Sequence, residues 1–315
     1  MRAMSYSTYG NAGVLRLVEL PKPVPGPGQV LVRVMACSVN PIDWKRASGA
    51  YRLIMPAKFP AVPTYDVAGI VEQAGPGVQG FAPGARVHAR IAEGTGAGAA
   101  EYAVVGVAEV TTMPEGLAFA EAAAMPLAGM TALQALRDLA GLTLEGSNQR
   151  VLVVGASGGV GHFGLQIARA AGATVVAVCS AKNADRVRRL GASAVVDYAK
   201  ADAYAGLPPF DIVLDCVASD PGPFLPRLGP KGVYVTCLPG PATLLRSALN
   251  PFTRKQVKVV MLKSNAADLA LLDGLYAAGK LQVVIDSRFP LEQLGAAWER
   301  SMSGRAVGKI VIDVG

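Results

Sequence analysis

The sequence predicts an α/β fold in which a doubly wound parallel sheet is joined to a smaller all-β unit. Strands and helices alternate from Arg150 to about Val235, which is the pattern of a parallel sheet with crossover helices. Before Phe119 the chain instead contains short β segments separated by Pro and Gly, and this is typical of a partly closed barrel. With 315 residues the chain is long enough for two domains, each with its own core.

Apolar runs and turn residues define the elements of the N-terminal part. We expect strands at 29–37, 66–73, 85–90 and 101–107, with Pro- and Gly-rich turns between them. Near Phe119 the composition changes to Ala and Leu. Helices are expected there at 119–124 and 131–140.

The second half of the chain alternates between the two kinds of element. Strands are expected at 151–155, 174–179, 194–197, 211–216, 232–237 and 257–263. Helices are expected at 159–171, 183–190 and 266–278. The last strand, at 309–314, is expected to pair back into the N-terminal unit.

A glycine-rich turn after the first of these strands carries the clearest functional signal. The apolar strand that starts at Val151 runs into a turn with Gly158, Gly159 and Gly161, and an amphipathic helix follows. Glycines leave no Cβ where phosphate oxygens must approach, and backbone N–H groups at a helix N-terminus bind a pyrophosphate. Because the motif follows a strand, opens a helix and leads into a second strand, it predicts dinucleotide binding. The alternative is a glycine-rich turn that binds nothing.

The end of the second strand predicts which dinucleotide binds. An NAD site has an acidic residue about 20 positions past the glycines, where it accepts hydrogen bonds from the ribose 2′-OH. Here the strand ends in Ser180, Ala181 and Lys182, without a carboxylate. A hydroxyl and an ammonium suit a 2′-phosphate, so we expect NADPH, with Tyr198 covering the adenosine phosphate. A solvated Lys182 and a Tyr198 that only packs on the surface are the alternatives.

Composition excludes several other classes of protein. Half of the residues are hydrophobic and 17% are charged, which indicates a compact chain without long disordered tails. No apolar run approaches the roughly 18 residues that a membrane helix needs, so membrane insertion is not expected. The N-terminal residues lack the apolar core of a signal peptide, and a cytoplasmic protein is therefore expected. The net charge of +7 is dispersed without an aromatic-studded basic stripe, so nucleic acid is not expected as a partner.

Potential metal ligands are few and scattered. The cysteines are Cys37, Cys179, Cys216 and Cys237. They form no CxxC pair and suit small buried hydrophobic positions better than a disulfide framework. His88 is expected to be structural, and His162 is expected to pack or to lie at the surface rather than to take part in chemistry. Zinc bound by these cysteines and histidines is therefore not expected.

Taken together, the motifs resemble the medium-chain dehydrogenase/reductase superfamily, and within it the zinc-independent quinone oxidoreductases of the zeta-crystallin-like branch. The resemblance spans nearly the whole chain. Its main marks are SVNPIDWKRASG (38–49), FPAVPTYDVAGIVEQAGPGVQGFAPGARV (59–87), GASGGVGHFGLQIA (155–168), LGASAVVDY (190–198) and GRAVGKIVIDV (304–314).

This resemblance implies a GroES-like β-barrel domain built from both chain ends, beside a Rossmann NADPH-binding domain, with the active site in the cleft between them. The expected boundaries are 1–122 for the N-terminal part of the catalytic domain, 123–263 for the Rossmann domain, and 264–315 for the C-terminal return to the catalytic domain. Relatives commonly pair through the edge strand of the cofactor domain, so a homodimer is expected.

The resemblance also implies cofactor-binding residues. Those implied for the phosphates are Ser157, Gly158, Gly159, Val160, Ser180, Lys182 and Tyr198. Leu238 is expected to contact the nicotinamide half through its backbone, and Asn40 and Thr131 are matched to positions beside the nicotinamide. Tyr51 matches a pocket tyrosine of some members.

The resemblance to the quinone oxidoreductases implies chemistry without a metal. Where the alcohol dehydrogenases of the superfamily carry a zinc-binding Cys this chain has Asn40, and where they carry the His and Glu of a GHE motif it has Tyr65 and Asp66. Hydride transfer from NADPH to a quinone or an α,β-unsaturated carbonyl suits such a site.

Asn40, Tyr51 and Tyr65 are the catalytic candidates, as hydrogen-bond donors to the anion that forms when the acceptor is reduced. Asn40 could instead cap the loop before Pro41, and either tyrosine could be packing. Solvent could supply the proton.

Two other functions stay open. A 2-enoyl thioester reductase would need a basic groove for a carrier phosphate, and Arg46 and Arg52 are candidates for it. A non-catalytic NADPH-binding sensor, or an RNA- or membrane-associated protein, would fit the basic character of the chain.

Overall fold

A computed structural model describes residues 1–91, 97–238 and 240–315, which form two compact units. The first unit consists of Met1–Ala128, Ser264–Gly274 and Val283–Gly315, and the second of Gly129–Lys263 and Leu275–Gln282. The first unit therefore contains both ends of the chain. The exact domain boundaries expected from the sequence remain predictions.

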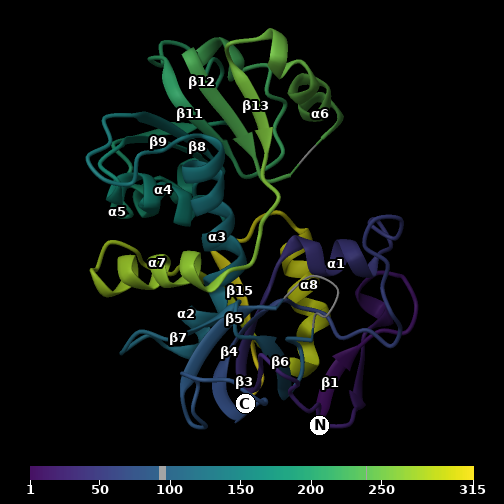
Figure 1. Cartoon of the computed structure of the whole chain (residues 1–315). Helices are drawn as coiled ribbons and strands as arrows, with labels where there is room; N and C mark the ends of the chain where they lie inside the picture. The colour runs from purple at the N-terminus through teal and green to yellow at the C-terminus, as the bar shows by residue number, and fades with distance from the viewer. Residues whose placement is uncertain (92–96, 239) are drawn as a thin grey trace. The chain divides into compact units, whose positions relative to one another are not determined.

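A seven-stranded sheet forms the centre of the first unit (Figure 1). Its order is β14-β15-β3-β4-β5-β7, and β6 also pairs with β3. The strands are β3 (Gln29–Val39), β4 (Asp66–Ala74), β5 (Arg86–Arg90), β6 (Tyr102–Gly106), β7 (Val110–Thr112), β14 (Ile285–Pro290) and β15 (Lys309–Asp313). A separate two-stranded sheet consists of β1 (Arg2–Ser5) and β2 (Arg16–Glu19). As predicted, the last strand returns to the N-terminal unit, where β15 pairs antiparallel with β3.

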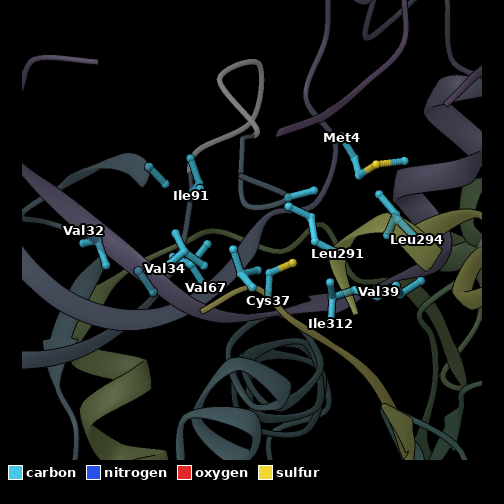
Figure 2. Packing of buried hydrophobic residues seen from close by; sticks show 14 of the residues in the cluster. Met4, Val32, Val34, Cys37, Val39, Val67, Ile91, Leu291, Leu294 and Ile312 are labelled. Carbon is cyan, nitrogen blue, oxygen red and sulfur yellow. The ribbon is translucent and has the colours of Figure 1, made fainter. Parts of the chain in front are cut away.

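The first unit has its own hydrophobic core, built from strands at both ends of the chain. Figure 2 shows Val34 and Cys37 of β3 packed in one cluster with Val67 of β4 and Ile312 of β15. Trp298 of α8 (Leu294–Met302) is fully buried in the same cluster. Burial of apolar side chains from both chain ends holds β15 in place, since this burial is the dominant favourable term in folding.

Helices flank the strands of both units. Besides α8 they are α1 (Pro41–Ala47), α2 (Phe119–Ala124), α3 (Pro126–Gln134), α4 (Gly161–Ala170), α5 (Ala184–Arg189), α6 (Pro241–Ala248) and α7 (Ala266–Ala277). Short 3-10 turns occur at Ala12–Val14, Ala181–Asn183, Leu225–Arg227, Asn250–Phe252 and Leu291–Gln293. The helix expected at 131–140 starts earlier, because Pro126 suits a first helical turn, and it continues into a π-helical segment, Ala135–Leu139.

The second unit contains a six-stranded sheet in which every neighbouring pair is parallel. Its order is β10-β9-β8-β11-β12-β13. The strands are β8 (Arg150–Val154), β9 (Thr174–Cys179), β10 (Ala194–Asp197), β11 (Phe210–Asp215), β12 (Leu228–Thr236) and β13 (Gln256–Val259). Numbered within the unit, this order is 3-2-1-4-5-6, which is the doubly wound Rossmann arrangement. The predicted fold class is confirmed.

Candidate active site

The carboxyl ends of the parallel strands meet at one edge of the sheet in the second unit. Strand β8 lies between β9 and β11, and its last residue, Val154, pairs with Val178 on one side and Asp215 on the other. Strand order reverses at this point, and ligands of such sheets bind outside the carboxyl ends at the switch point. The glycine-rich turn follows β8 directly, so it lies where a ligand is expected.

Close contacts make glycine necessary at both ends of this turn. Gly155 has a φ of +75°, and a Cβ on it would lie 2.5 Å from Cγ1 of Val217. A Cβ on Gly161, the first residue of α4, would lie 2.1 Å from the carbonyl oxygen of Gly155. Neither position has room for a side chain. Between them lie the half-buried residues predicted for the pyrophosphate, Ser157, Gly158, Gly159 and Val160.

Asn183 connects the two serines that were predicted to bind the cofactor. Its Nδ2 donates to Oγ of Ser157 at 3.1 Å and to Oγ of Ser180 at 3.3 Å. The turn after β8 is thereby tied to the end of β9. Sequence reasoning missed this residue, although its position directly after Lys182 was a signal that could have found it.

The predicted 2′-phosphate residues lie at the carboxyl ends of β9 and β10. Lys182 is exposed and Tyr198 is 61% exposed. Among the residues that the structure describes, neither side chain has a hydrogen-bonded or ionic partner. A carboxylate ends β10 beside them: Asp197 pairs with Cys179 in the strand register, and its Oδ1 accepts the N–H of Ala199 at 3.1 Å.

The two remaining predicted cofactor residues of this unit are less exposed. The N–H of Leu238 donates to Oγ1 of Thr236 at 3.2 Å, and the side chain of Leu238 is half-buried. Thr131 lies in α3 and is 6% exposed. His162, expected to pack or to lie at the surface, is buried, and its Nδ1 lies 2.9 Å from the carbonyl oxygen of Gly158 in the turn.

Asn40 belongs to the first unit, where it lies in a buried polar cluster. Its Nδ2 donates to Oδ2 of Asp66 at 2.8 Å, and its Oδ1 accepts a hydrogen bond from Nζ of Lys309. The Lys309 ammonium also lies 3.7 Å from Asp66 Oδ2. The backbone N–H of Asn40 donates a hydrogen bond to Oδ2 of Asp43 at 2.7 Å. The Asn40 amide therefore does more than cap the loop before Pro41.

Asp66 is the centre of this cluster. It is fully buried, and besides Asn40 it accepts hydrogen bonds from Oγ of Ser38 at 2.8 Å and from the N–H of Leu127 at 2.9 Å. Several donors and a nearby ammonium offset the cost of burying a carboxylate. Lys309 was not identified from the sequence, because it is 269 residues from Asn40 along the chain and no local motif connects the two.

Burial shifts the pKa of two groups in the cluster. It lowers the pKa of Lys309, an effect that Asp66 and Asp43 oppose. It raises the pKa of Asp43 to about 8, against the backbone hydrogen bond from Asn40. Oδ1 of Asp43 is buried without a hydrogen-bond partner in the described part of the chain.

Tyr65 lies beside Arg46 rather than within the Asn40 cluster. Nη1 of Arg46 donates to the Tyr65 hydroxyl at 2.8 Å, and its Nη2 donates to the carbonyl oxygen of Pro56 at 3.0 Å. Both side chains are buried, and burial raises the pKa of Tyr65. Tyr51 is half-buried in a turn, and within the described ranges its side chain makes no hydrogen bond to Asn40 or Tyr65.

Two structural features are absent from residues 1–91, 97–238 and 240–315. No group of three or more His, Cys, Asp or Glu could hold a metal ion. No helix is long and apolar enough to cross a membrane. His88 is buried as a structural residue, with Nε2 at 3.1 Å from Asp273 and Nδ1 at 3.0 Å from the carbonyl oxygen of Ala122.

A doubly wound sheet with a glycine turn at its switch point defines a dinucleotide-binding α/β protein. Family models identify the class more closely. The alcohol dehydrogenase GroES-like domain matches residues 26–134, and a family described as zinc-binding dehydrogenase matches residues 190–312.

Curated proteins similar to the chain are oxidoreductases. A chloroplast envelope quinone oxidoreductase homolog of Arabidopsis thaliana is 39% identical, over 99% of this chain and 98% of that protein. A 2-methylene-furan-3-one reductase of Solanum lycopersicum is 35% identical, over 99% and 79%. A mitochondrial NAD(P)H oxidoreductase of Homo sapiens is 31% identical, over 100% and 89%.

Solved structures give the same result. The quinone oxidoreductase from Coxiella burnetii matches with a TM-score of 0.90 and 30% identity, over 100% of this chain and 99% of that one. A mycobacterial protein complexed with NADPH matches with a TM-score of 0.82 and 26% identity, over 99% of both chains. The chain belongs to the medium-chain dehydrogenase/reductase superfamily, in its quinone oxidoreductase branch, and is an oxidoreductase.

The names of these relatives correct one expectation. A cytoplasmic protein was predicted because the N-terminal residues lack the apolar core of a signal peptide. Relatives that match almost the whole chain are instead named for the chloroplast envelope and for mitochondria, so the cytoplasmic prediction is wrong. The physical reason is that signals for import into organelles are amphipathic and rich in Arg and Ser, and a test for an apolar core cannot detect them.

Asp43 is expected to make stability depend on pH. Its pKa is 3.8 in an unperturbed chain and about 8 in the fold, so between these values the folded state binds more protons than the unfolded state. The free energy of unfolding should therefore fall as pH rises from about 4 to about 8, by up to about 1.4 kcal/mol per pH unit. Asp43→Asn cannot ionise and keeps an acceptor for the Asn40 N–H, so its stability should decline less steeply.

Urea unfolding at three pH values in this window measures the slope. Asp185→Asn is the matched control, because this exposed carboxylate of α5 should leave the wild-type slope unchanged. Equal slopes for Asp43→Asn and the wild-type protein would show that Asp43 is already ionised at neutral pH.

Proposed function

We propose that this protein uses NADPH to reduce quinones or α,β-unsaturated carbonyls and that it does so without zinc. The observation that carries the proposal is the glycine turn at the switch point, next to strand β9, which is followed by Ser180 and Lys182. Relatives named as a quinone oxidoreductase and as a 2-methylene-furan-3-one reductase support the acceptor class. The similar mycobacterial structure with NADPH supports the cofactor.

The residues of the second unit fit a nicotinamide dinucleotide. The turn from Gly155 to Gly161 is packed too closely for side chains at its two end glycines, and Ser157 within it is held in place by Asn183. The exposed Lys182 ammonium suits a 2′-phosphate better than a 2′-OH. When bound, NADPH supplies a hydride, and the protein binds and orients it. Val160, Thr131, Tyr198 and Leu238 are further proposed contacts.

The donor set of the first unit does not suit zinc, even though one matching family is described as a zinc-binding dehydrogenase. The oxygens of Asn40 and Asp66 face the Lys309 ammonium, which already supplies a cation at this point. A zinc ion beside it would be repelled, and an amide is a poor substitute for the thiolate or imidazole that zinc prefers. These contacts support chemistry without a metal.

Asn40 is the strongest of the three catalytic candidates. Its amide orientation is fixed, because Oδ1 accepts from Lys309 and one N–H of Nδ2 is donated to Asp66. The second N–H of Nδ2 is left for the oxygen of an acceptor, where negative charge develops as the hydride arrives. An amide cannot supply a proton, so we assign the proton to solvent. Tyr65 keeps its O–H free to donate while it accepts from Arg46, and Tyr51 remains a candidate.

Of the two basic residues that a 2-enoyl thioester reductase could use to bind a carrier phosphate, one is not accessible. Arg46 is 9% exposed and is bound to Tyr65 and Pro56, so it cannot hold a carrier phosphate. Arg52 is exposed. We also retain the homodimer as a proposal, because β13 is an edge strand of the parallel sheet and nearby Leu249 and Phe252 are exposed.

The proposed activity is tested by following NADPH oxidation with a panel of quinones and enones, and with crotonyl thioester as a comparison. We expect turnover with quinones or enones, several times faster than with the thioester, and no loss after dialysis against a zinc chelator. Zinc analysis of the purified protein accompanies the assay. Cofactor binding without turnover of any acceptor would exclude the reductase function.

Lys182 is expected to determine the preference for NADPH. Loss of a charged hydrogen bond of about 1.5–3 kcal/mol should weaken NADPH binding of Lys182→Ala by about 10- to 100-fold. The Kd for NADH should not change, since NADH lacks the phosphate. Fluorescence titration measures both. Arg189→Ala is the matched control. It removes a different exposed cation, which lies in α5, and it should bind NADPH like the wild type. Tighter binding of NADH by the wild-type protein would contradict the assignment.

Asn40→Ala is expected to lower kcat/KM for the acceptor by about 10²- to 10³-fold, as removal of an oxyanion donor does in other enzymes. Ser38→Ala is the matched control, because it removes a different hydrogen bond to Asp66 and leaves the Asn40 amide in place. Both variants should lose some stability, which urea unfolding measures, but only Asn40→Ala should lose most of its activity. Similar losses of activity in both variants would assign Asn40 a structural role.

A further inference from the structure

Two of the four cysteines lie next to each other at the carboxyl edge of the parallel sheet. Strands β11 and β12 end at Asp215 and Thr236, which are partners in the strand register. Cys216 and Cys237 are the next residue of each chain segment, and the N–H of Cys237 donates to the carbonyl oxygen of Asp215 at 3.1 Å. The pairing of β11 and β12 thus extends as far as the cysteines.

Both cysteine side chains lie on the same face of the sheet. Asp215 is on the opposite face, where its Oδ2 accepts from the hydroxyl of Tyr234 at 2.6 Å and lies 3.4 Å from Oγ1 of Thr236. Since side chains alternate along a strand, the cysteines that follow Asp215 and Thr236 share the other face. The neighbouring Cys237 thiol raises the pKa of Cys216 well above its usual value.

The backbone spacing at this point suits a disulfide. Neighbouring strands lie about 4.8 Å apart, and Cα atoms joined by a disulfide are usually about 4.4–6.8 Å apart. Two cysteines in register on adjacent strands, with side chains on one face, can therefore be bridged without a large movement of the backbone.

Exposure separates this pair from the other two cysteines. Cys37 and Cys179 are buried, whereas Cys216 and Cys237 are partly exposed, and all four are free thiols. Burial raises the pKa of Cys37 to about 12. A small oxidant in solution can thus reach the Cys216–Cys237 pair more easily than the buried thiols.

The pair also lies beside the glycine turn. A Cβ on Gly155 would be 3.7 Å from the Cβ of Cys216, and Val217 packs still closer to the same point. Cys237 directly precedes Leu238, which is proposed to contact the nicotinamide half. A dinucleotide bound at this turn would cover the thiols.

We propose that Cys216 and Cys237 form a redox-active dithiol that a peroxide oxidises to a disulfide and that a bound dinucleotide protects. One thiolate attacks a peroxide oxygen and displaces hydroxide, which takes up a proton to become water, and a sulfenic acid is left. The second thiol attacks the sulfenic sulfur, loses its proton and releases a second water. Hydrogen peroxide thus gains two electrons and two protons, and the dithiol loses both. Protection of the dithiol by a bound dinucleotide rests on the proposed function, whereas formation of the disulfide does not.

The thiolate is the reacting form, so the raised pKa of Cys216 makes the pair slow to react at neutral pH. Below the pKa, the thiolate fraction rises about tenfold per pH unit, and oxidation should accelerate accordingly. The pair should therefore stay reduced until the oxidant or the pH is high.

The test treats the reduced full-length protein with hydrogen peroxide at about pH 8 and measures intact mass and linked peptides. We expect loss of two hydrogen masses and one peptide pair joined through Cys216 and Cys237. Cys216→Ser and Cys237→Ser should instead gain oxygen on the remaining thiol. Cys37→Ala and Cys179→Ala lose a buried thiol and should still form the bridge. Oxygen addition to both thiols of the wild-type pair without a linked peptide, or a bridge that persists in Cys216→Ser, would overturn the proposal.

A second arm repeats the oxidation with NADP⁺. At about 100 times its Kd the dinucleotide leaves about 1% of the sites empty, so bridge formation should slow by up to about 100-fold. If the bridge forms at the same rate with and without NADP⁺, the dinucleotide does not lie over the thiols. That result would contradict the placement of the cofactor and the protection, while the linked peptide would still establish the dithiol.

Discussion

The arrangement of the first unit depends on the contact of the Lys309 ammonium with Asn40 and Asp66. An ammonium and a carboxylate that are both buried would be strongly destabilising if either lacked partners. Each is provided for: Lys309 bonds to Asn40 and lies close to Asp66, and Asp66 accepts further hydrogen bonds from Ser38 and Leu127. Because Lys309 is the first residue of the last strand, its charge ties the C-terminal strand to segments near the start of the chain.

The same contact bears on the chemistry of the site. The Lys309 ammonium balances the negative charge of Asp66 within the cluster. Its hydrogen bond to Oδ1 also holds the Asn40 amide in one orientation. An amide held by partners on both sides loses little entropy when it donates its remaining N–H to an anion. Asp43 accepts a hydrogen bond from the Asn40 backbone, and it is almost completely buried, which raises its own pKa.

Local patterns predicted most of the fold. The strands at 174–179 and 194–197 and the helix at 119–124 have the predicted bounds, because apolar runs and turn residues lie close together in the sequence there. Strand β14 was missed, since IDSRFP alternates weakly and lies at the sheet edge. In the second unit the glycine turn could be predicted from its motif. The roles of Lys309 and Asn183 could not, because they arise from tertiary hydrogen bonds to Asn40, Ser157 and Ser180.

The parallel direction of the strands explains why the predicted functional residues of the second unit lie together at the carboxyl ends of its strands. Each crossover returns the chain to the same end of the sheet, so residues that directly follow the strands become neighbours whatever their separation in sequence. The glycine turn follows β8, Ser180 follows β9, Cys216 follows β11 and Cys237 follows β12. A mutation that lets one strand slide by one residue would turn its terminal side chain to the other face. The backbone hydrogen bond from Cys237 to Asp215 fixes that register at the point where the two thiols meet.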